Sequence, residues 1–256
     1  VAAGGSATYL CYEHDERMQL QKLIAMEASL ADPEDSVLLP RLAEALGTGG
    51  ANDRGLPGRI GHLPGVAAAL AALDSYGDRL RLVTGSGHAT DVTAVRRLAQ
   101  TMPARGLLVV DYLQKVATGS AVRSEDDSVT IIVENLKDTA MEYGVPILAV
   151  CAAAREGISE GRTRLRHMRG STAIAYEADI ALVLNDKWHA VARHHLTYGG
   201  SSAERFHDWV VCSVEKNRAG RPGADMEFRQ RFRHARFEPT GQIVSEELID
   251  ERVFRE

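Results

Sequence analysis

The stretch GLLVVDYLQ, residues 106–114, decides the fold because it reads as a buried strand that ends on a carboxylate. Four apolar residues, Leu107 to Val110, run directly into Asp111. In an open α/β sheet, ligands bind at the carboxyl ends of the parallel strands, so this aspartate is placed where a ligand can reach it. Its usual task in that position is to hold Mg²⁺ through water beside nucleotide phosphates. The alternative is structural: Asp111 caps the next turn or pairs with an arginine.

Length and composition favour one α/β domain. The chain has 256 residues, of which 45% are hydrophobic and 25% charged, and this is enough for one large core. A net charge of −5 and a pI near 6.0 exclude a polycationic nucleic-acid binder, although a local basic surface is compatible with them. The cysteines Cys11, Cys151 and Cys212 lie far apart in apolar runs, which predicts buried thiols in a reducing compartment.

The sequence predicts a cytoplasmic protein with no membrane partner. No apolar run approaches the roughly 20 residues that span a bilayer, and the N-terminus lacks the features of a signal peptide. The chain begins VAAGGSA without an initiator methionine, and an apolar run follows within a few residues, so we expect a segment of something longer.

Apolar strands alternate with amphipathic helices along the chain, which favours a parallel sheet. The expected strands are residues 8–12, 80–84, 107–110, 145–151, 180–184 and 209–215. The expected helices are residues 16–31, 37–46, a helix that ends near 73, a helix that begins near 91 with Thr90 as N-cap, and 128–143. Residues 47–65 are expected to be a loop, 186–208 an insertion and 226–239 a terminal hairpin. Because no repeat or low-complexity linker interrupts the pattern, we expect one domain over residues 1–256.

The strand LLVVDYLQ strongly resembles the Walker B strand of the DnaB-type replicative helicases, a branch of the RecA-like ATPases. Further blocks follow in the order of that family: RLRLVTGSGHATDVTAVRRLAQ, VENLKDTAMEYGVPILAV, HMRGSTAIAYEADIALVL and VEKNRAGRPG. The resemblance implies a RecA-like P-loop NTPase core of the α/β class, with a mainly parallel central sheet flanked by helices and a C-terminal β-hairpin. It also implies ATP and Mg²⁺ as cofactors, single-stranded DNA as a partner and a role in DNA replication.

The resemblance assigns roles to two carboxylates that follow strands. Asp111 would hold Mg²⁺ through water, and Glu13 would activate the water that attacks the nucleotide. The register is ambiguous by one residue, because KaiC-like members have glutamates at the positions of both Glu13 and His14, whereas DnaB itself has its glutamate at the position of His14, and we prefer Glu13. The alternative is that the acidic cluster at residues 13–16 simply favours the start of the next helix.

A second set of roles falls on Lys216 and Arg218. In the family such a pair reaches into the site of the neighbouring subunit as arginine fingers do, which requires a homo-oligomeric ring, most often a hexamer. From the residues alone, a solvated basic turn is the alternative. The residues that we assign to nucleotide binding are Asp111, Gln114, Arg155, Lys216 and Arg218.

The most basic stretch of the chain is REGISEGRTRLRHMRG, residues 155–170. In the family, loops at this point face a central channel and contact the backbone of single-stranded DNA, for which arginines are suitable phosphate ligands. A mobile solvent loop is the alternative. The predicted DNA-binding residues are Arg162, Arg164, Arg166 and Arg169.

Three features depart from the family pattern. The residues contain no P-loop, G-x-x-x-x-G-K-[ST], which we therefore expect upstream of residue 1. Ala153 stands where the family has a glutamine that links the γ-phosphate to the DNA loops, which puts that coupling in doubt. The insertion contains His189, His194 and His195, but no cysteine or regular carboxylate accompanies them as in a metal site.

The leading hypothesis is a DnaB-like ATP-hydrolysing motor that acts on single-stranded DNA as a ring. One alternative is a KaiC-like or recombinase-like regulatory ATPase without unwinding activity, which the alanines at 152–154 favour. The other alternative is a scaffold that forms rings without hydrolysis.

Overall fold

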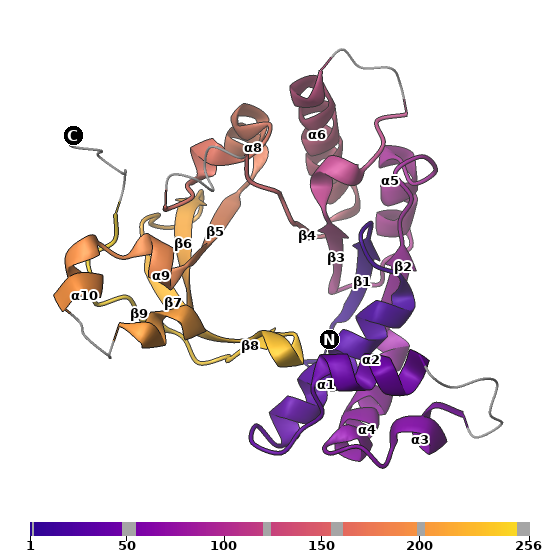
Figure 1. The fold of residues 1–256 in the computed structure, drawn as a ribbon. Coiled ribbons are helices and arrows are strands. Elements are labelled where there is room, and N and C mark those ends of the chain that lie inside the picture. Colours follow the sequence, from indigo (N-terminus) through magenta and orange to yellow (C-terminus); the bar gives the residue numbers. More distant parts are fainter. Residues whose placement is uncertain (2, 48–54, 120–123, 155–160, 199–202, 250–256) are drawn as a thin grey trace. The chain divides into compact units, whose positions relative to one another are not determined.

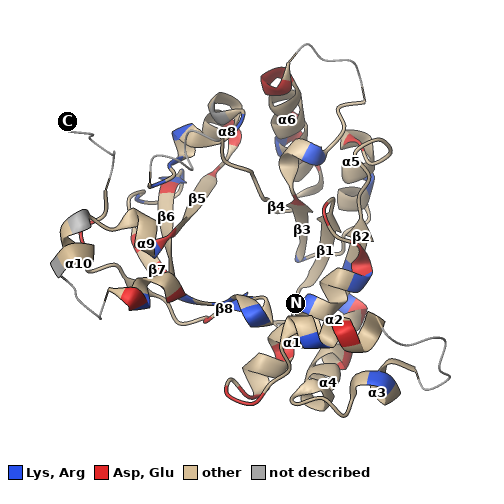
Figure 2. Ribbon diagram, in the orientation of Figure 1, with Lys and Arg blue, Asp and Glu red and all other residues tan. Residues whose placement is uncertain are grey.

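The computed structural model describes residues 1, 3–47, 55–119, 124–154, 161–198 and 203–249 (Figure 1). They group into two compact units, in both of which acidic and basic positions are interspersed (Figure 2). The first unit comprises residues 1–119, 139–150 and 231–236, and the second comprises residues 120–138, 151–230 and 237–256. The expectation of one domain over residues 1–256 stays a prediction.

The first unit is built on a four-stranded parallel sheet with the strand order β2-β1-β3-β4. Its strands are β1 (Ser6–Cys11), β2 (Leu80–Thr84), β3 (Gly106–Asp111) and β4 (Ile147–Ala149). Strand β3 lies between two neighbours, and Leu108 and Val110 on it are fully buried. A strand covered on both faces needs a continuous apolar run, and this explains the four apolar residues before Asp111.

Helices flank this sheet. They are α1 (Glu16–Ala31), α2 (Leu39–Gly47), α3 (Gly55–Ile60), α4 (Val66–Tyr76) and α5 (Val92–Gln100), with the 3₁₀ turns η1 (Gly77–Arg79), η2 (Leu113–Lys115) and η6 (Phe232–His234). Helix α6 (Glu125–Tyr143) belongs to both units, with residues 125–138 in the second unit and residues 139–143 in the first. The predicted helix over residues 16–31 is confirmed, and the Asp15 carboxylate caps it by accepting a hydrogen bond from the Met18 amide at 2.8 Å. The cap expected at Thr90 is wrong, because Asp91 accepts from the Ala94 amide at 2.9 Å. Aspartate is at least as good a cap as threonine.

The loop predicted for residues 47–65 is wrong for residues 55–60, which form α3. Pro57 is the third residue of this short helix, where its missing N–H is no loss because the first amides of a helix have no internal partner. Ile60 is fully buried, so the helix also contributes to the core. The glycines and prolines concealed a helix that packing stabilises, and residues 48–54 lie outside the described residues.

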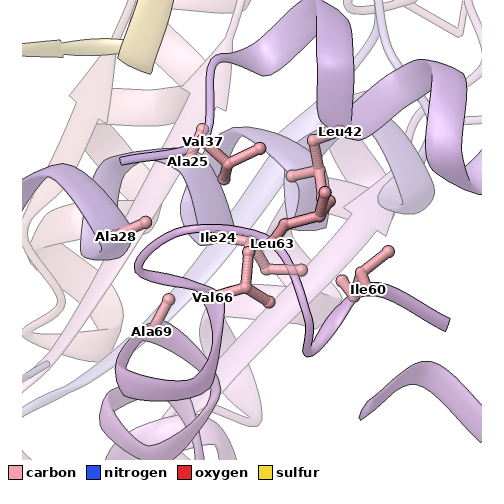
Figure 3. Close-up of a cluster of buried hydrophobic side chains, with 9 residues drawn as sticks. All are labelled: Ile24, Ala25, Ala28, Val37, Leu42, Ile60, Leu63, Val66 and Ala69. Carbon is pink, nitrogen blue, oxygen red and sulfur yellow. The ribbon is translucent and has the colours of Figure 1, made fainter. Parts of the chain in front are cut away.

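A cluster of nine buried side chains joins α1 to α2, α3 and α4 (Figure 3). Gly65, which precedes α4, has φ +72°, and a Cβ there would lie 3.0 Å from the Cβ of Ala28. Glycine is therefore needed both for the left-handed backbone and for the close approach to α1. The buried members are Ile24, Ala25, Ala28, Val37, Leu42, Ile60, Leu63, Val66 and Ala69.

The second unit contains a mainly antiparallel sheet of five strands in the order β5-β6-β7-β8, with β9 paired to β7. The strands are β5 (Ile180–Asp186), β6 (Trp209–Asn217), β7 (Asp225–Arg231), β8 (Arg236–Phe237) and β9 (Gln242–Ile243). The predicted combination of a helix-flanked parallel sheet with antiparallel strands at the C-terminus is confirmed. The antiparallel part is larger than the hairpin expected over residues 226–239, since it already begins at β5.

The remaining helical segments belong to the second unit. They are η3 (Leu165–His167), α8 (Ser171–Glu177), α9 (Lys187–Ala190), α10 (Arg193–Tyr198) and η5 (Glu204–Asp208). The insertion predicted for residues 186–208 thus contains short helices, and Lys187 anchors it. The Lys187 side chain is 3% exposed, and its ammonium group bonds to Glu227 and, at 2.7 Å, to Glu246. Two carboxylates satisfy a cation that would be costly to bury alone.

Apolar side chains are exposed on the terminal strands of both sheets. Strand β5 alternates between exposed and buried positions, and Ile180, Leu182 and Leu184 are more than half exposed. Leu148 on β4 and Val150 just after it are 51% and 43% exposed. Among the described residues, β4 and β5 each pair with another strand along one edge only.

The three cysteines are free thiols. Cys11 is buried, but the prediction of buried thiols is wrong for Cys151 and Cys212, which are half-buried. Cys151 follows the terminal strand β4, which explains its partial exposure. In the part of the chain that the structure describes, no helix is both long and apolar enough to cross a membrane.

We predict that Ile24→Ala lowers the free energy of unfolding by about 2–5 kcal/mol, because it leaves a cavity in the cluster around α1. Leu30→Ala in the same helix is the matched control and should cost less than about 0.5 kcal/mol, since Leu30 is 48% exposed whereas Ile24 is fully buried. Urea unfolding measures both values. Equal losses for the two variants would contradict this description of the core.

Candidate functional site

The carboxyl ends of β1, β2 and β3 meet at one edge of the parallel sheet. Cys11, the last residue of β1, lies opposite Thr84 on β2 and opposite Asp111 on β3. The ladder continues for one step, as the Tyr12 amide donates to the Asp111 carbonyl oxygen at 2.7 Å. Glu13 comes directly after this residue. The structure therefore brings Asp111 and Glu13, the two predicted catalytic carboxylates, to the same edge.

A tyrosine hydroxyl stabilises the Asp111 carboxylate. The Tyr9 hydroxyl donates to Oδ2 at 2.6 Å, and the Cys11 Sγ lies 3.8 Å from the same oxygen. Asp111 is half-buried, and the Asp111–Tyr112 peptide bond is cis. The desolvation of a carboxylate at the end of a buried strand is thus offset by a hydroxyl donor and by partial contact with water.

The pKa of Tyr9 is raised above its ordinary value. Burial of the ring is the largest cause, followed by the hydrogen bond to Asp111 and the charge of that carboxylate. Cys11 and Glu13 act on the same hydroxyl in the same direction. Glu13 therefore lies within electrostatic range of the Tyr9 hydroxyl that Asp111 contacts directly.

Of the three carboxylates after β1, Asp15 and Glu16 have structural contacts, whereas Glu13 has none with the described residues. Asp15 caps α1, and Glu16 accepts a hydrogen bond from the Thr84 amide at 3.0 Å, which lowers the pKa of Glu16. Glu13 is exposed, and its side chain has no hydrogen bond or ion pair to any other described residue. Stabilisation of the helix start thus accounts for Asp15 and Glu16 and leaves Glu13 available for chemistry.

Backbone hydrogen bonds join the turn after β3 to the segment after β4, at the carboxyl ends of these strands. The Leu113 amide donates to the Val150 carbonyl at 2.9 Å, and the Val150 amide donates to Val110 at 2.9 Å. This fixes the turn η2, which contains the half-buried Gln114. Arg155, which was also assigned to the nucleotide site, lies outside the described residues.

Lys216 and Arg218 belong to the second unit, at and just after the end of β6. The Lys216 ammonium donates to the carbonyl oxygens of Ala175 and Tyr176 at 2.5 and 3.0 Å. Arg218 donates to the Tyr176 carbonyl and, at 3.1 Å, to the Asp179 carboxylate. Burial, followed by the charge of Arg218, lowers the pKa of Lys216. The pair is therefore held at the C-terminal end of α8 and is not a freely solvated turn.

The predicted DNA-binding arginines have different surroundings. The Arg162 side chain is 6% exposed and donates to Asp225 at 2.7 Å and to Ser213 at 3.1 Å. Arg164 lies 2.6 Å from a carboxylate oxygen of Glu215. These two arginines therefore pack against acidic strand residues inside the second unit. Sequence reasoning missed this, although Glu215 at the end of the predicted strand 209–215 was a candidate partner.

The other two arginines lie nearer to solvent. Arg166 is exposed, and its Nε lies 3.0 Å from Nε2 of His167. Arg169 pairs with Glu125 in the first turn of α6. Ala153, at the position of the family glutamine, forms a backbone bridge with Met168 next to this segment.

The histidines of the insertion pack with their neighbours. The rings of His194 and His195 lie 4.0 Å apart, and Nε2 of His195 accepts a hydrogen bond from the Glu247 amide at 2.9 Å. Within the described ranges, no group of three or more His, Cys, Asp or Glu side chains is arranged to hold a metal ion.

Solved structures show the class of protein to which this fold belongs. One match is a DnaB-like replicative helicase that was studied together with its interactions with primase. Its TM-score is 0.67 and its identity is 16%, over 92% of this chain and 50% of that chain. The ATPase domain of G40P matches with a TM-score of 0.65 and 16% identity over 92% of this chain and 74% of that chain. The chain therefore has the RecA-like fold of these helicases, as the sequence predicted.

Sequence comparison shows the family. The DnaB-like helicase C-terminal domain family matches residues 84–238, more than half of the chain, and the chain belongs to this family. The chain is 27% identical to the replicative DNA helicase DnaB of Rickettsia bellii (strain RML369-C) over 127 residues, 47% of this chain and 26% of that protein. It is 35% identical to DnaB of Mycobacterium intracellulare over 92 residues, 35% of this chain and 16% of that protein. The chain thus spans about a quarter or less of the length of these relatives.

The raised pKa values of Tyr9, Tyr12 and Tyr76 predict a pH-dependent stability. A group whose pKa is raised on folding contributes stability that is present below its unfolded value of about 10 and is lost at higher pH. The free energy of unfolding, measured with urea, should therefore fall as the pH rises above about 10. Tyr9→Phe should make this fall shallower, whereas Tyr176→Phe, at a position 68% exposed, is the control. A slope unaffected by Tyr9→Phe would contradict the described surroundings of Asp111.

Proposed function

We propose that this chain is part of a DnaB-like motor that hydrolyses ATP and acts on single-stranded DNA. The observation that supports this most strongly is the placement of Asp111 and Glu13 after adjacent parallel strands, within range of the same Tyr9 hydroxyl. Hydrolysis of a phosphoanhydride needs a carboxylate beside the metal and a second group that orients water, and one sheet edge supplies both. The relatives that this chain resembles in sequence are replicative DNA helicases.

Asp111 suits a magnesium ion held through water. Carboxylate oxygens are preferred ligands of Mg²⁺, and Asp111 is partly exposed, with Oδ2 bonded to Tyr9. When bound, Mg²⁺ would neutralise charge on the β- and γ-phosphates of ATP. Glu13 would accept a hydrogen bond from the attacking water and orient it, a role for which its exposure is an advantage. Gln114 and Arg155 would contact the nucleotide.

Lys216 and Arg218 would act on the nucleotide of a neighbouring subunit. Both are cations at the end of a strand, and the Arg218 side chain is 48% exposed. A guanidinium offers five donors in a planar fork that matches phosphate oxygens. Action in a neighbouring site requires a closed ring, for which we propose a hexamer.

The phosphate-binding P-loop is proposed to come from residues outside this chain. A P-loop belongs to a strand that leads into a helix, and both elements need a surface on which to pack. Strand β4 of the parallel sheet pairs along one edge only with the strands that the structure describes, and Leu148 on it is 51% exposed, so it offers such a surface.

Single-stranded DNA is proposed to contact the segment around η3. Arg166 and Arg169 would bind phosphates, since Arg166 is exposed and Arg169 is only half-buried. Arg162 and Arg164 would also contribute to DNA binding in this segment. Their ion pairs with Asp225 and Glu215 would hold the segment in shape. The contribution of arginine to such binding is largely electrostatic and therefore depends on salt.

One observation favours a second candidate, a regulatory ATPase whose hydrolysis is not coupled to DNA. Ala153 has no side-chain hydrogen-bonding group, so the link that a glutamine would make between nucleotide and DNA segments is missing at this position. The response of hydrolysis to DNA separates this candidate from a motor.

We predict that the complete gene product hydrolyses ATP, and that Asp111→Asn and Glu13→Gln each lower kcat by at least about 100-fold. Asp15→Asn is the matched control, because asparagine caps a helix as well as aspartate does and the carboxylate of Asp15 is already used in capping. Steady-state phosphate release, with and without single-stranded DNA, measures these rates. Hydrolysis that rises with DNA supports a motor, whereas hydrolysis indifferent to DNA supports a regulatory ATPase. Absence of hydrolysis by the unaltered protein would contradict both and favour a ring scaffold.

We also predict that Arg166→Ala weakens binding of a fluorescent oligothymidylate and reduces the steepness of log K against log salt by about 0.7–1. Arg97→Ala is the control, since Arg97 is also an exposed arginine and lies on α5 in the first unit. Fluorescence anisotropy at several salt concentrations measures both properties. Equal effects of the two substitutions would show that binding depends on overall charge and not on the η3 segment.

A further inference from the structure

The C-terminal end of α8 gathers oxygen atoms around the two proposed trans-acting cations. The carbonyl oxygens of Ala175 and Tyr176 accept hydrogen bonds from Lys216, and Tyr176 also accepts from Arg218. The last carbonyls of a helix have no partner within the helix, so they are available to side-chain donors. Lys216 and Arg218 are thereby fixed relative to α8 within their own subunit.

Asp179, two residues after α8, holds Arg218 at two points. Its backbone carbonyl accepts from the Arg218 amide at 2.9 Å, and its carboxylate accepts from Nη1 of Arg218 at 3.1 Å. A contact at both the main chain and the side chain restricts the direction in which the guanidinium points. The Asp179 side chain is 59% exposed, so its value for stability is small and its geometric effect is the more important one.

The Asp179 carboxylate is itself fixed from α6. The Lys137 ammonium donates to both carboxylate oxygens, at 2.8 and 2.7 Å. These bonds are the largest cause of the lowered pKa of Asp179, and Arg218 contributes further. Asp179 thus remains ionised at neutral pH, and Lys137 fixes the orientation of the carboxylate that Arg218 contacts.

We propose that Asp179 is a positioning residue that sets the direction of Arg218 for action in the neighbouring subunit. This inference rests on the proposed function. The recorded contacts use only part of the donor capacity of each cation, since a guanidinium has five N–H groups and an ammonium three. The remaining donors of a half-exposed Arg218 would be presented to a phosphate at low entropic cost, because the side chain is already ordered.

The test compares substitutions in the complete, ring-forming gene product. Asp179→Asn should lower kcat for ATP at least 10-fold with less than a 3-fold change in KM. The reason is that Lys216 and Arg218, the proposed fingers, would act mainly on the transition state of a nucleotide bound by the neighbouring subunit. Asp179→Glu should retain more activity than Asp179→Asn, because it keeps the charge. Glu142→Gln is the control, since it removes a carboxylate that pairs with an arginine, Arg96, at an exposed position of the first unit. Its kcat should be unchanged.

Mixed rings separate positioning from a general structural effect. A mixture of Asp179→Asn with Asp111→Asn subunits should hydrolyse more ATP than either variant alone, because some interfaces combine an intact Asp111 with an intact finger. A mixture of Asp179→Asn with Arg218→Ala should show no such recovery, because every interface then receives a defective finger. Recovery in the second mixture, or full activity of Asp179→Asn alone, would overturn the proposal.

A further mixture tests the proposed function by itself. Subunits with Asp111→Asn and subunits with Arg218→Ala should recover activity together if the finger acts in trans. Failure of that mixture would overturn trans action in a ring. If this mixture recovers activity but Asp179→Asn is fully active, trans action is supported and only the positioning role of Asp179 is overturned.

Discussion

The register between β1 and β3 is the constraint on which the candidate site depends. Because Cys11 lies opposite Asp111, the residues that follow β1 meet the residue that ends β3 at one edge of the sheet. A shift of one residue would turn Tyr9 to the other face and remove the hydroxyl that stabilises the Asp111 carboxylate. Leu108 and Val110 of β3 are fully buried, so the packing of the first unit and the position of the candidate site depend on the same strand register.

Ionic contacts organise the second unit in a comparable way. Asp179 joins Lys137 on α6 to Arg218 after β6, and Arg169 joins the segment after η3 to Glu125 at the start of α6. The proposed DNA-binding and trans-acting residues are therefore connected to the same helix. This connection does not involve position 153, where the family has a glutamine and this chain has Ala153. Coupling through α6 would require two discrete arrangements of these contacts.

Much of the parallel sheet could be predicted because strands and helices of different period follow one another in the sequence. The helix over residues 16–31 and the strand over residues 80–84 have the expected bounds, and Asp111 and Glu13 lie at the same edge of the parallel sheet. Helix α3 could not be predicted because its stability comes from the burial of Ile60, which outweighs local glycine and proline signals. The surroundings of Arg162 and of Arg218 depend on contacts between distant segments, which no local pattern reveals.

The most direct test of the central claim is a structure of the complete protein with Mg²⁺ and a non-hydrolysable ATP analogue. Our account predicts a metal-bound water hydrogen-bonded to Asp111, and Glu13 about 2.6–3.2 Å from the water that faces the γ-phosphate. A nucleotide bound away from the carboxyl ends of β1 and β3, with Asp111 bonded to Tyr9 and no metal nearby, would contradict it.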